Sequence, residues 1–533
     1  MADSRSDLEK GDVDSMSKYN QAPAYKANSN GSGWPNYGET TEVQGNVLHR
    51  VLHSFQRAPS TIDPDGKLTE HGRAFDPDHA AMATADNKMA RSLKGRHMQM
   101  IAIGGSIGTG LFIASGKALE TGGPASLLIS FSLIGIMLFC MVHALGEMAV
   151  LLPVAGSFST YSSRFLDPSW GFAMGWVRSP IILGAILNCG GGPNEGYIGG
   201  KYWHDPGAFH NGFKGLCSVF VTAAFAFAGT ELVGLAANEA QNPRKSLPSA
   251  IKQVFWRITI FYVVSLAVVG LNVPYTDERL LKDGSANTTA SPFVISIQNA
   301  GIEVLPSVFN VVILLAVLSV GNSSIFGSSR TLHALALQGL APKWFGYIDK
   351  KGRPLVGIGV ASVIGFIAYA ADSGSQGTVL DWLLAISGLS SVFTWGSICL
   401  AHIRFRRAWK LQGHTLKELA FISQPGLVGS WFGFLFNCLI LIAQFWVGAY
   451  PVDYGDIGVK GQVNKFFKAY LAAPVVIIFY IGHKFYAKTS IMRCKDMDLK
   501  TGIRDLNLPE LIAQENVERA AWPKWKKIYK IWC

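Results

Sequence analysis

The sequence predicts an all-helical integral membrane protein with about ten transmembrane spans, and two observations carry this prediction. The 533 residues are 49% hydrophobic and only 16% charged, whereas soluble proteins carry about 25% charged residues. The apolar residues also gather into repeated runs of about 20 residues, the length of a helix that crosses a bilayer. Helices are expected because only helices and closed barrels satisfy their backbone hydrogen bonds in lipid, and no run alternates with the period of a strand.

Ten apolar runs follow one another between residues 98 and 486. A Gly-Gly-Pro turn at 122–124 separates the first two, and Arg178 and Pro180 interrupt the third. The runs are 98–119, 125–152, 170–189, 217–240, 254–273, 304–327, 355–371, 382–403, 427–450 and 466–486. They define a transmembrane domain over 97–486, between tails at 1–96 and 487–533. The first tail is predicted to be disordered, because its polar residues bury too little apolar surface to fold alone.

The distribution of positive charge predicts the orientation. The net charge is +11, and Lys and Arg concentrate in alternate loops, which then stay on the cytosolic side. This alternation holds if the run 170–189 crosses once, and it puts both tails in the cytosol. Asn287, in an Asn-Thr-Thr sequon, then lies outside and is a glycosylation candidate. Nucleic-acid binding is not predicted, because no basic stretch carries base-stacking aromatic side chains.

The residue patterns of common enzyme sites are absent from the sequence. It has no metal-ligand spacing, no phosphate-binding loop and no nucleophile beside a positioned base. Its seven cysteines are scattered and fall mostly inside apolar runs, which is typical of small hydrophobic side chains rather than of a disulfide framework. We therefore expect no enzyme, no cofactor and no metal ion.

The first apolar run contains four glycines within seven residues, at 104–110. Each glycine lowers helix propensity by about 1 kcal/mol, so the helix is predicted to break there and to face a cavity. Free backbone N–H groups and a half-helix dipole then suit a carboxylate. The alternative is close helix packing through small residues. The predicted carboxylate-binding residues are Ser106, Ile107, Gly108, Thr109 and Gly110.

A second interruption is predicted in the middle of the fourth run, at Phe227, Ala228, Gly229, Thr230 and Glu231. Unwound carbonyls there would accept hydrogen bonds from an ammonium group, and the Glu231 carboxylate adds negative charge. Two interrupted spans are the sequence pointer to a midplane binding site in a transporter. One site for a carboxylate and one for an ammonium describes an α-amino acid. The alternative for Glu231 is a structural acid, protonated or paired inside the bundle.

Two acids are candidates for coupling transport to protons, Glu147 and Glu231. Glu147 lies near the cytosolic end of the second run, and a proton relay needs an acid that alternates between charged and neutral forms. The alternative is a helix-end acid that pairs with Arg164 or with a backbone amide. His143, one turn earlier, is predicted to be a packing residue.

Long stretches of this sequence resemble the fungal amino-acid permeases. They include GGSIGTGLFIASGKAL (104–119), HALGEMAVLLPVAGSF (143–158), FAFAGTELVGLAANEAQNPRKSLPSAI (225–251) and SGLSSVFTWGSICLAHIRFRRAW (387–409). The resemblance runs from about Arg91 to the end of the chain. It implies membership of the amino acid–polyamine–organocation superfamily, with a LeuT-like inverted-repeat transporter fold of twelve spans, cotransport of protons with amino acids, and a plasma-membrane location.

The resemblance also implies roles for particular residues. Residues 106–110 match the carboxylate-binding break of the family, and Ala228, Gly229 and Glu231 match its amine-binding break. A region near the substrate gate is matched by Ser387, Ser390, Ser391 and Trp395.

The chain departs from the family pattern after Trp176. There, Val177–Pro180 joins the start of the third span directly to the end of the fifth. This fusion keeps every later loop on its proper side but removes about half of the scaffold against which the mobile bundle rocks. A gene-model error and a real shortened product both account for it.

Several residues outside the spans are candidates for other contacts. Arg404, Arg406, Arg407 and Lys410 form a basic cluster that either contacts anionic lipid or simply anchors the topology. Cys533 ends a segment rich in Trp and Lys and is a palmitoylation candidate. In related permeases, ubiquitin is attached to the N-terminal tail, here represented by Lys10, Lys18 and Lys26.

These observations predict an amino-acid permease that takes up its substrates by proton symport and alternating access. Two alternatives remain from other classes: a permease-like sensor that binds amino acids without transporting them, and an inactive product that lacks its scaffold. The expected partners are amino acids, protons and membrane lipid.

Overall fold

The computed structural model describes residues 53–58, 77–85, 89, 93, 110–152, 199–240, 243–281, 291–299, 305–366, 376–452, 454–455, 458–503 and 522–523. Within these residues the regular structure is helical, apart from two isolated bridges between Arg57 and Asp349 and between Leu93 and Ala240. The all-helical prediction is therefore confirmed for the described part of the chain.

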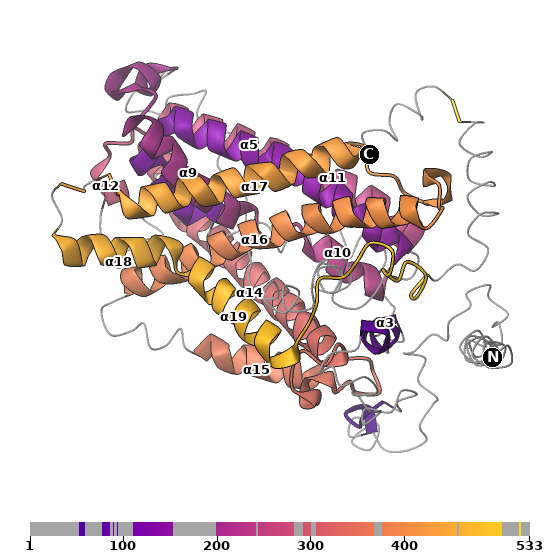
Figure 1. The fold of residues 1–533 in the computed structure, drawn as a ribbon. Helices are drawn as coiled ribbons and strands as arrows, with labels where there is room; N and C mark the ends of the chain where they lie inside the picture. The colour runs from indigo at the N-terminus through magenta and orange to yellow at the C-terminus, as the bar shows by residue number, and fades with distance from the viewer. Residues whose placement is uncertain are drawn as a thin grey trace, which may run out of the picture.

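Seven long helices form the body of the molecule (Figure 1). They are α5 (Ser115–Leu151), α9 (Gly212–Phe227), α11 (Pro243–Asn272), α14 (Leu305–Leu337), α16 (Gln376–Leu411), α17 (Gly426–Ala449) and α19 (Ala472–Ala487). Shorter helices are α3 (Pro77–Ala85), α10 (Leu232–Ala236), α12 (Glu278–Leu281), α13 (Pro292–Asn299), α15 (Leu355–Gly365) and α18 (Val459–Tyr470). Single turns of π or 3-10 helix are η1 (Gly110–Ala114), η2 (Trp203–Gly207), η3 (Ala237–Glu239), η5 (Lys343–Gly346) and η7 (Leu416–Glu418).

Eight of the ten predicted runs coincide with described helices. The run 98–119 is described only from residue 110, and the run 170–189 lies outside the described residues. Four described helical stretches are long and apolar enough to cross a membrane: Ser115–Leu151, Gly212–Glu239, Ala385–Leu411 and Gly426–Ala449. The pair α18 and α19, bent by 62°, makes a fifth if it counts as one span.

The predicted Gly-Gly-Pro turn is a kink inside α5. Gly123 has φ 78° and ψ 170°, in the left-handed half of backbone space that favours glycine. A Cβ at Gly123 would lie 2.8 Å from the backbone nitrogen of His210, which donates a hydrogen bond to the Gly122 carbonyl. The kink therefore separates the first two runs, as the sequence predicts.

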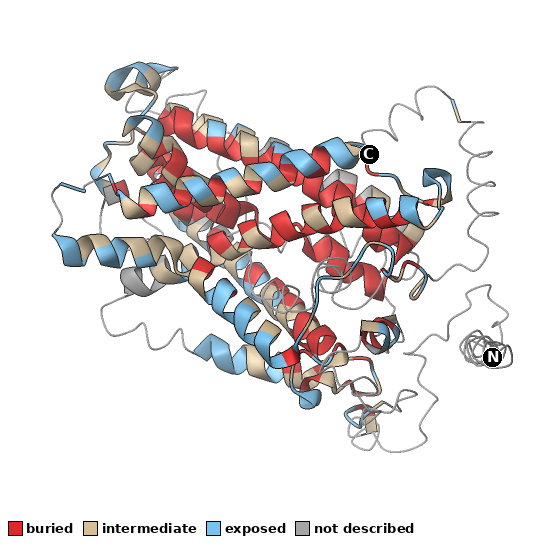
Figure 2. Cartoon of the chain, in the orientation of Figure 1, coloured by how far each residue is buried: buried red, intermediate tan, exposed pale blue. Residues whose placement is uncertain are grey.

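The core lies where α5 packs against α9, α11 and α16. Figure 2 shows buried residues concentrated on these helices, and exposed residues along α17, α18 and α19. The largest fully buried side chains include Trp395, Tyr262, Phe131 and Phe227. Phe131, Phe227 and Tyr262 form one aromatic cluster, with ring centroids 4.4–6.0 Å apart.

The helix α17 has the inside-out polarity of a membrane helix. Its buried face carries small and polar residues, with Asn437 Nδ2 donating to the Gly433 carbonyl at 2.7 Å and Gln444 Nε2 to the Ala469 carbonyl at 3.2 Å. Its exposed face is apolar and aromatic, including Val428, Trp431, Leu435, Leu439 and Ile442. Lipid accepts such a face, whereas water would not.

Segments on both sides of the helical domain pack against it. Gln56 and Ala58 exchange backbone hydrogen bonds of 2.9 Å with Lys350 and Ile348, in the connection between α14 and α15. After α19, the chain returns along α16, where Gln412 Nε2 donates to the Met497 carbonyl at 2.7 Å. Parts of both predicted tails therefore have a defined structure against the membrane domain.

Candidate functional site

The fourth predicted span is interrupted at the expected place. Helix α9 ends at Phe227 and α10 begins at Leu232. Between them Ala228 is extended, with φ −56° and ψ 134°, and Gly229 has φ 126°. Only glycine adopts that value without strain, because it has no Cβ. The sequence pattern Ala-Gly-Thr therefore breaks the helix locally.

A side chain from another helix completes the backbone hydrogen bonding at this break. In an unbroken helix, the Ala226 carbonyl would accept the N–H of residue 230. Here it accepts the hydroxyl of Tyr262, from α11, at 2.6 Å. Tyr262 is fully buried and packs on Phe227. A carbonyl released from a helix inside a membrane needs such a donor, so Tyr262 stabilises the interrupted form.

The first predicted span meets the break of the fourth. A Cβ built on Gly110 would lie 2.4 Å from the Ala226 Cα, so the two backbones touch and only glycine fits. Gly110 also opens η1, a turn of π-helix, a feature that often marks functional sites. Of the predicted carboxylate-binding residues, Ser106, Ile107, Gly108 and Thr109 lie outside the described residues.

The Glu231 carboxylate contacts the predicted gate region. Trp395, on α16, donates its indole N–H to Glu231 Oε2 at 3.2 Å, and the Gly229 amide lies 3.4 Å from the same oxygen. Both Glu231 and Trp395 are buried. The other gate residues bond within their own helix, where Ser390 and Ser391 donate to the Ser387 carbonyl at 3.0 and 3.1 Å. The fold thus joins two predicted site regions through one hydrogen bond.

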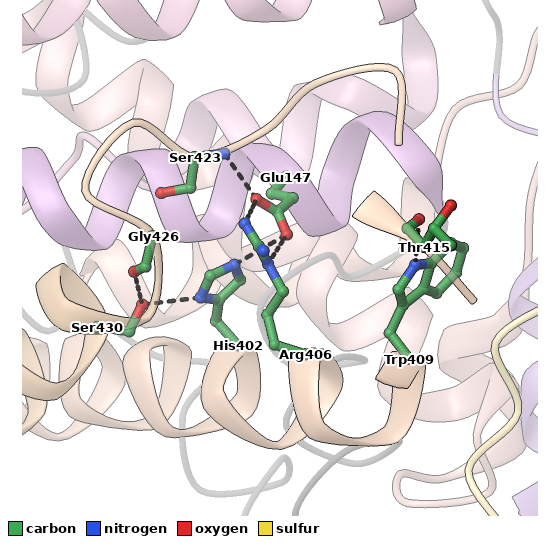
Figure 3. Close-up of polar contacts among 8 residues, drawn as sticks. All are labelled: Glu147, His402, Arg406, Trp409, Thr415, Ser423, Gly426 and Ser430. Atoms are coloured by element: carbon green, nitrogen blue, oxygen red, sulfur yellow. Dashed lines mark hydrogen bonds and ion pairs between the residues drawn. The ribbon is translucent and has the colours of Figure 1, made fainter. Parts of the chain in front are cut away.

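Glu147 belongs to a buried ionic cluster at the end of α5 (Figure 3). Arg406, on α16, reaches both carboxylate oxygens: its Nε contacts Oε1 and its Nη2 donates to Oε2 at 2.7 Å. The Ser423 amide, in the connection between α16 and α17, also donates to Oε2 at 2.6 Å. His402 Nε2 lies 3.2 Å from Oε1. The exposed fraction of the Glu147 side chain is 0% and that of Arg406 is 7%.

Sequence reasoning missed this partner. Arg164, the predicted one, lies outside the described residues, and Arg406 was assigned to a basic cluster at the membrane surface. Within that cluster Arg407 and Lys410 are exposed, Arg404 contacts the Met492 carbonyl, and Arg406 points inward. One feature of the sequence could have indicated this partner. His402 and Arg406 are four residues apart, so a helix places both on one face, where they can meet the same acid.

A second ion pair joins the far end of the broken span to α14. Arg330 Nε lies 2.5 Å from Glu239 Oε1, and its Nη2 lies 3.2 Å from Oε2. The Arg330 guanidinium also covers the ring of Phe326, 3.6 Å from its centroid. The backbone of Glu239 accepts the Leu93 amide at 3.0 Å. Two acidic residues on broken or kinked spans, Glu147 and Glu239, are therefore each tied to an arginine on a neighbouring helix.

The remaining predicted residues are not described. Asn287, Cys533 and the tail lysines Lys10, Lys18 and Lys26 all lie outside the described residues, as does the junction at 176–181. Their proposed modifications and origin remain predictions.

Comparison with known proteins gives one consistent result. The family described as amino acid permease matches residues 97–178 and 179–496. The general amino-acid permease GAP2 of Candida albicans is 50% identical, over 91% of this chain and 93% of its own length. The general amino-acid permease GAP1 of Saccharomyces cerevisiae is 47% identical, over 90% of each chain. The cationic amino acid transporter 1 of Schizosaccharomyces pombe is 44% identical, over 97% of this chain and 100% of its own.

These alignments also bear on the departure seen in the sequence. The alignment with GAP2 extends over 560 positions, more than the 533 residues of this chain. The relative therefore carries residues with no counterpart here. The family match is divided between residues 178 and 179, inside the stretch where the sequence predicts the fused spans.

Proposed function

We propose, from the premise that this chain belongs to the amino acid permease family, that it carries amino acids into the cell together with protons. Uptake takes place at the plasma membrane by alternating access, with both tails in the cytosol. The observation that carries the proposal is the backbone contact of Gly110 with Ala226, immediately before the break at Ala228 and Gly229. A binding site made of two interrupted helices is the arrangement that transporters of zwitterions use.

The ammonium group of the substrate binds at the end of α9. This helix has 16 residues, and the negative end of its dipole lies at Phe227. Backbone carbonyls at the break and the Glu231 carboxylate together favour a cation there. Because the Ala226 carbonyl already accepts the Tyr262 hydroxyl, the substrate uses the carbonyls that follow it. The carboxylate of the substrate binds the amides of 106–110.

The residue Glu231 supports substrate binding and connects the binding site to the neighbouring helix. It lies at the break, and its contact with Trp395 links the site to α16. Symport requires a proton that crosses together with the substrate, so the negative charge of Glu231 binds the ammonium while the proton is carried on another group. Glu147 lies in its ionic cluster, away from the break. It can affect substrate binding only through movement of the helices that it joins.

The test is uptake by the full chain in proteoliposomes, with a panel of labelled amino acids and an inward proton gradient. We expect accumulation above the external concentration, abolished by a protonophore. Binding without accumulation would instead identify a sensor. Neither binding nor uptake would identify an inactive product, and sequencing the transcript across Trp176–Ile181 would then reveal whether residues are missing.

A matched pair of variants tests the substrate site. Glu231→Gln keeps an oxygen for the Trp395 indole but removes the charge, so the KM for amino acids should rise by about tenfold or more, the effect of losing one charge-assisted contact. Glu278→Gln changes an exposed acid on α12 and should leave KM unchanged. An unchanged KM in Glu231→Gln would exclude Glu231 from ammonium binding.

A further inference from the structure

The ionic cluster around Glu147 contains one imidazole, that of His402. The Arg406 guanidinium stays protonated in proteins. The Glu147 carboxylate accepts three hydrogen bonds, two from Arg406 and one from the Ser423 amide, and all three favour its ionised form. Protonation of Glu147 would remove an acceptor from at least one of these donors. That leaves the imidazole of His402, the side chain type that changes charge between pH 5 and 8.

His402 has a contact at each ring nitrogen, but only the contact at Nδ1 has hydrogen-bond geometry. Its Nε2 lies 3.2 Å from Glu147 Oε1, on α5, and its Nδ1 lies 2.8 Å from Ser430 Oγ, on α17. Ser430 Oγ is in turn 3.3 Å from the Gly426 carbonyl. Figure 3 shows these contacts as one chain that runs from the first turn of α17, through His402, to Glu147 and Arg406.

The hydrogen bond between His402 Nδ1 and Ser430 Oγ can form in two protonation states. With His402 charged, Nε2–H faces Glu147, Nδ1–H donates to Ser430 Oγ, and the Ser430 hydroxyl donates to the Gly426 carbonyl. With His402 neutral and Nε2 still protonated, Ser430 turns its hydroxyl proton to Nδ1 and releases the Gly426 carbonyl. The gain or loss of the proton therefore changes a bond between α16 and α17 through rotation of one hydroxyl group.

The charges facing His402 oppose each other. Glu147, on α5, attracts a protonated imidazole, and Arg406, one turn along α16, repels it. Helix α17 contributes the uncharged Ser430, and the connection before it contributes the Ser423 amide. The other imidazole of this region, His143 on α5, has its Nδ1 2.9 Å from the Phe139 carbonyl and its ring 6.1 Å from that of Phe421. With Glu147 and Arg406 both charged, the cluster is neutral when His402 is neutral and carries one positive charge when His402 is protonated.

The same helix leads from His402 to the substrate site. Trp395, which contacts Glu231, precedes His402 by seven residues on α16. Seven residues make two turns, so both side chains leave the same face, about 10 Å apart along the axis. A shift of α16 relative to α5 or α17 therefore also moves Trp395, which contacts Glu231.

We propose that His402 is the residue that takes up and releases the coupled proton, while Glu147 and Arg406 remain a fixed ion pair beside it. The proposal rests on the proposed proton symport. It differs from a scheme in which Glu147 itself is protonated, because the charge of Glu147 is already compensated by its donors.

The test compares His402→Gln with His143→Gln, a buried histidine of the same region, in proteoliposomes. Two readouts are needed: accumulation driven by a pH difference of one unit, and counterflow exchange of labelled for unlabelled amino acid without a gradient. A 1:1 symporter accumulates its substrate about tenfold under that gradient, since one pH unit corresponds to a tenfold ratio. We expect His402→Gln to keep exchange but to lose the tenfold accumulation, and His143→Gln to keep both.

Several results would overturn the proposal. Tenfold accumulation in His402→Gln excludes His402 as the proton carrier. If His402→Gln and His402→Asn both fail to exchange, Ser430→Ala decides: it keeps the imidazole but removes the partner of Nδ1, so the pH midpoint of uptake should move. An unmoved midpoint refutes the proposal. Failure of the native chain to accumulate under the gradient refutes the symport on which it rests, and that result is separate from a failure confined to His402 variants.

Discussion

Removal of one member of the buried Glu147–Arg406 pair should destabilise the protein strongly. In Arg406→Met, the Glu147 carboxylate keeps an exposed fraction of 0% but loses both guanidinium hydrogen bonds. An unpaired buried charge of this kind costs about 3–5 kcal/mol. Unfolding entropy of about 2 cal/mol/K per residue, over roughly 400 folded residues, converts this loss into a fall in Tm of about 4–6 °C.

The assay is thermal unfolding of the purified chain in detergent, with Arg407→Met as the control. Arg407 is exposed and occupies the next position of the same helix, so its substitution should change stability by less than about 0.5 kcal/mol. The double variant Glu147→Gln, Arg406→Met removes both charges and should recover part of the loss, because no charge is then left unpaired. Arg406→Met with the same Tm as Arg407→Met would refute the reasoning.

Three further predictions concern other contacts. Gly110→Ala should destabilise the chain by about 1–3 kcal/mol or more and abolish uptake, since the new Cβ would lie 2.4 Å from the Ala226 Cα. Gly359→Ala is the control: a Cβ at Gly359 meets no atom within 4 Å, so stability and uptake should not change. Tyr262→Phe leaves a buried carbonyl without its donor and should cost about 1–3 kcal/mol in thermal unfolding, while an unchanged Tm would contradict this role. The hydrogen bonds that Glu418 accepts from the Thr415 amide and hydroxyl, and from His414, hold the pKa of Glu418 below its ordinary 4.5. Their stabilisation is therefore complete above pH 4.5 and is lost as pH falls through the lower folded value. The hydrogen-exchange protection factor of this turn, which compares the observed rate with that of an unstructured chain at the same pH, should therefore fall with acid in the native chain but not in Glu418→Gln.

The parts of the fold predicted from sequence were those with a local cause. A helix break at Ala228 and Gly229 follows from residue types within five positions, and the kink at Gly123 follows from Gly-Gly-Pro. Apolar runs reveal spans because their length is set by the bilayer. Such features need no knowledge of what packs against them.

The contacts that were missed join residues far apart in the chain. Glu147 and Arg406 are separated by 259 positions, and no periodicity indicates such a pair. The apolar run of this span ends at Ile403, whereas α16 continues to Leu411. The polar extension was assigned to a loop, and with it the buried Arg406. The hydrogen bond between Trp395 and Glu231 has the same origin, since it spans 164 positions.

The contact between Gly110 and Ala226 sets the geometry of any tilting motion. Because Gly110 has no side chain, its backbone already touches that of Ala226 and neither can advance toward the other, so the contact would act as a fulcrum if α9 tilts. Helix α9 has 16 residues and is therefore about 24 Å long. A rotation of about 10° at the fulcrum displaces the opposite end of α9 by about 4 Å, close to the width of a methylene chain, while the fulcrum itself stays in place. If the proposed alternating access tilts α9 about this contact, a small change of angle there produces a larger displacement at the far end of the helix.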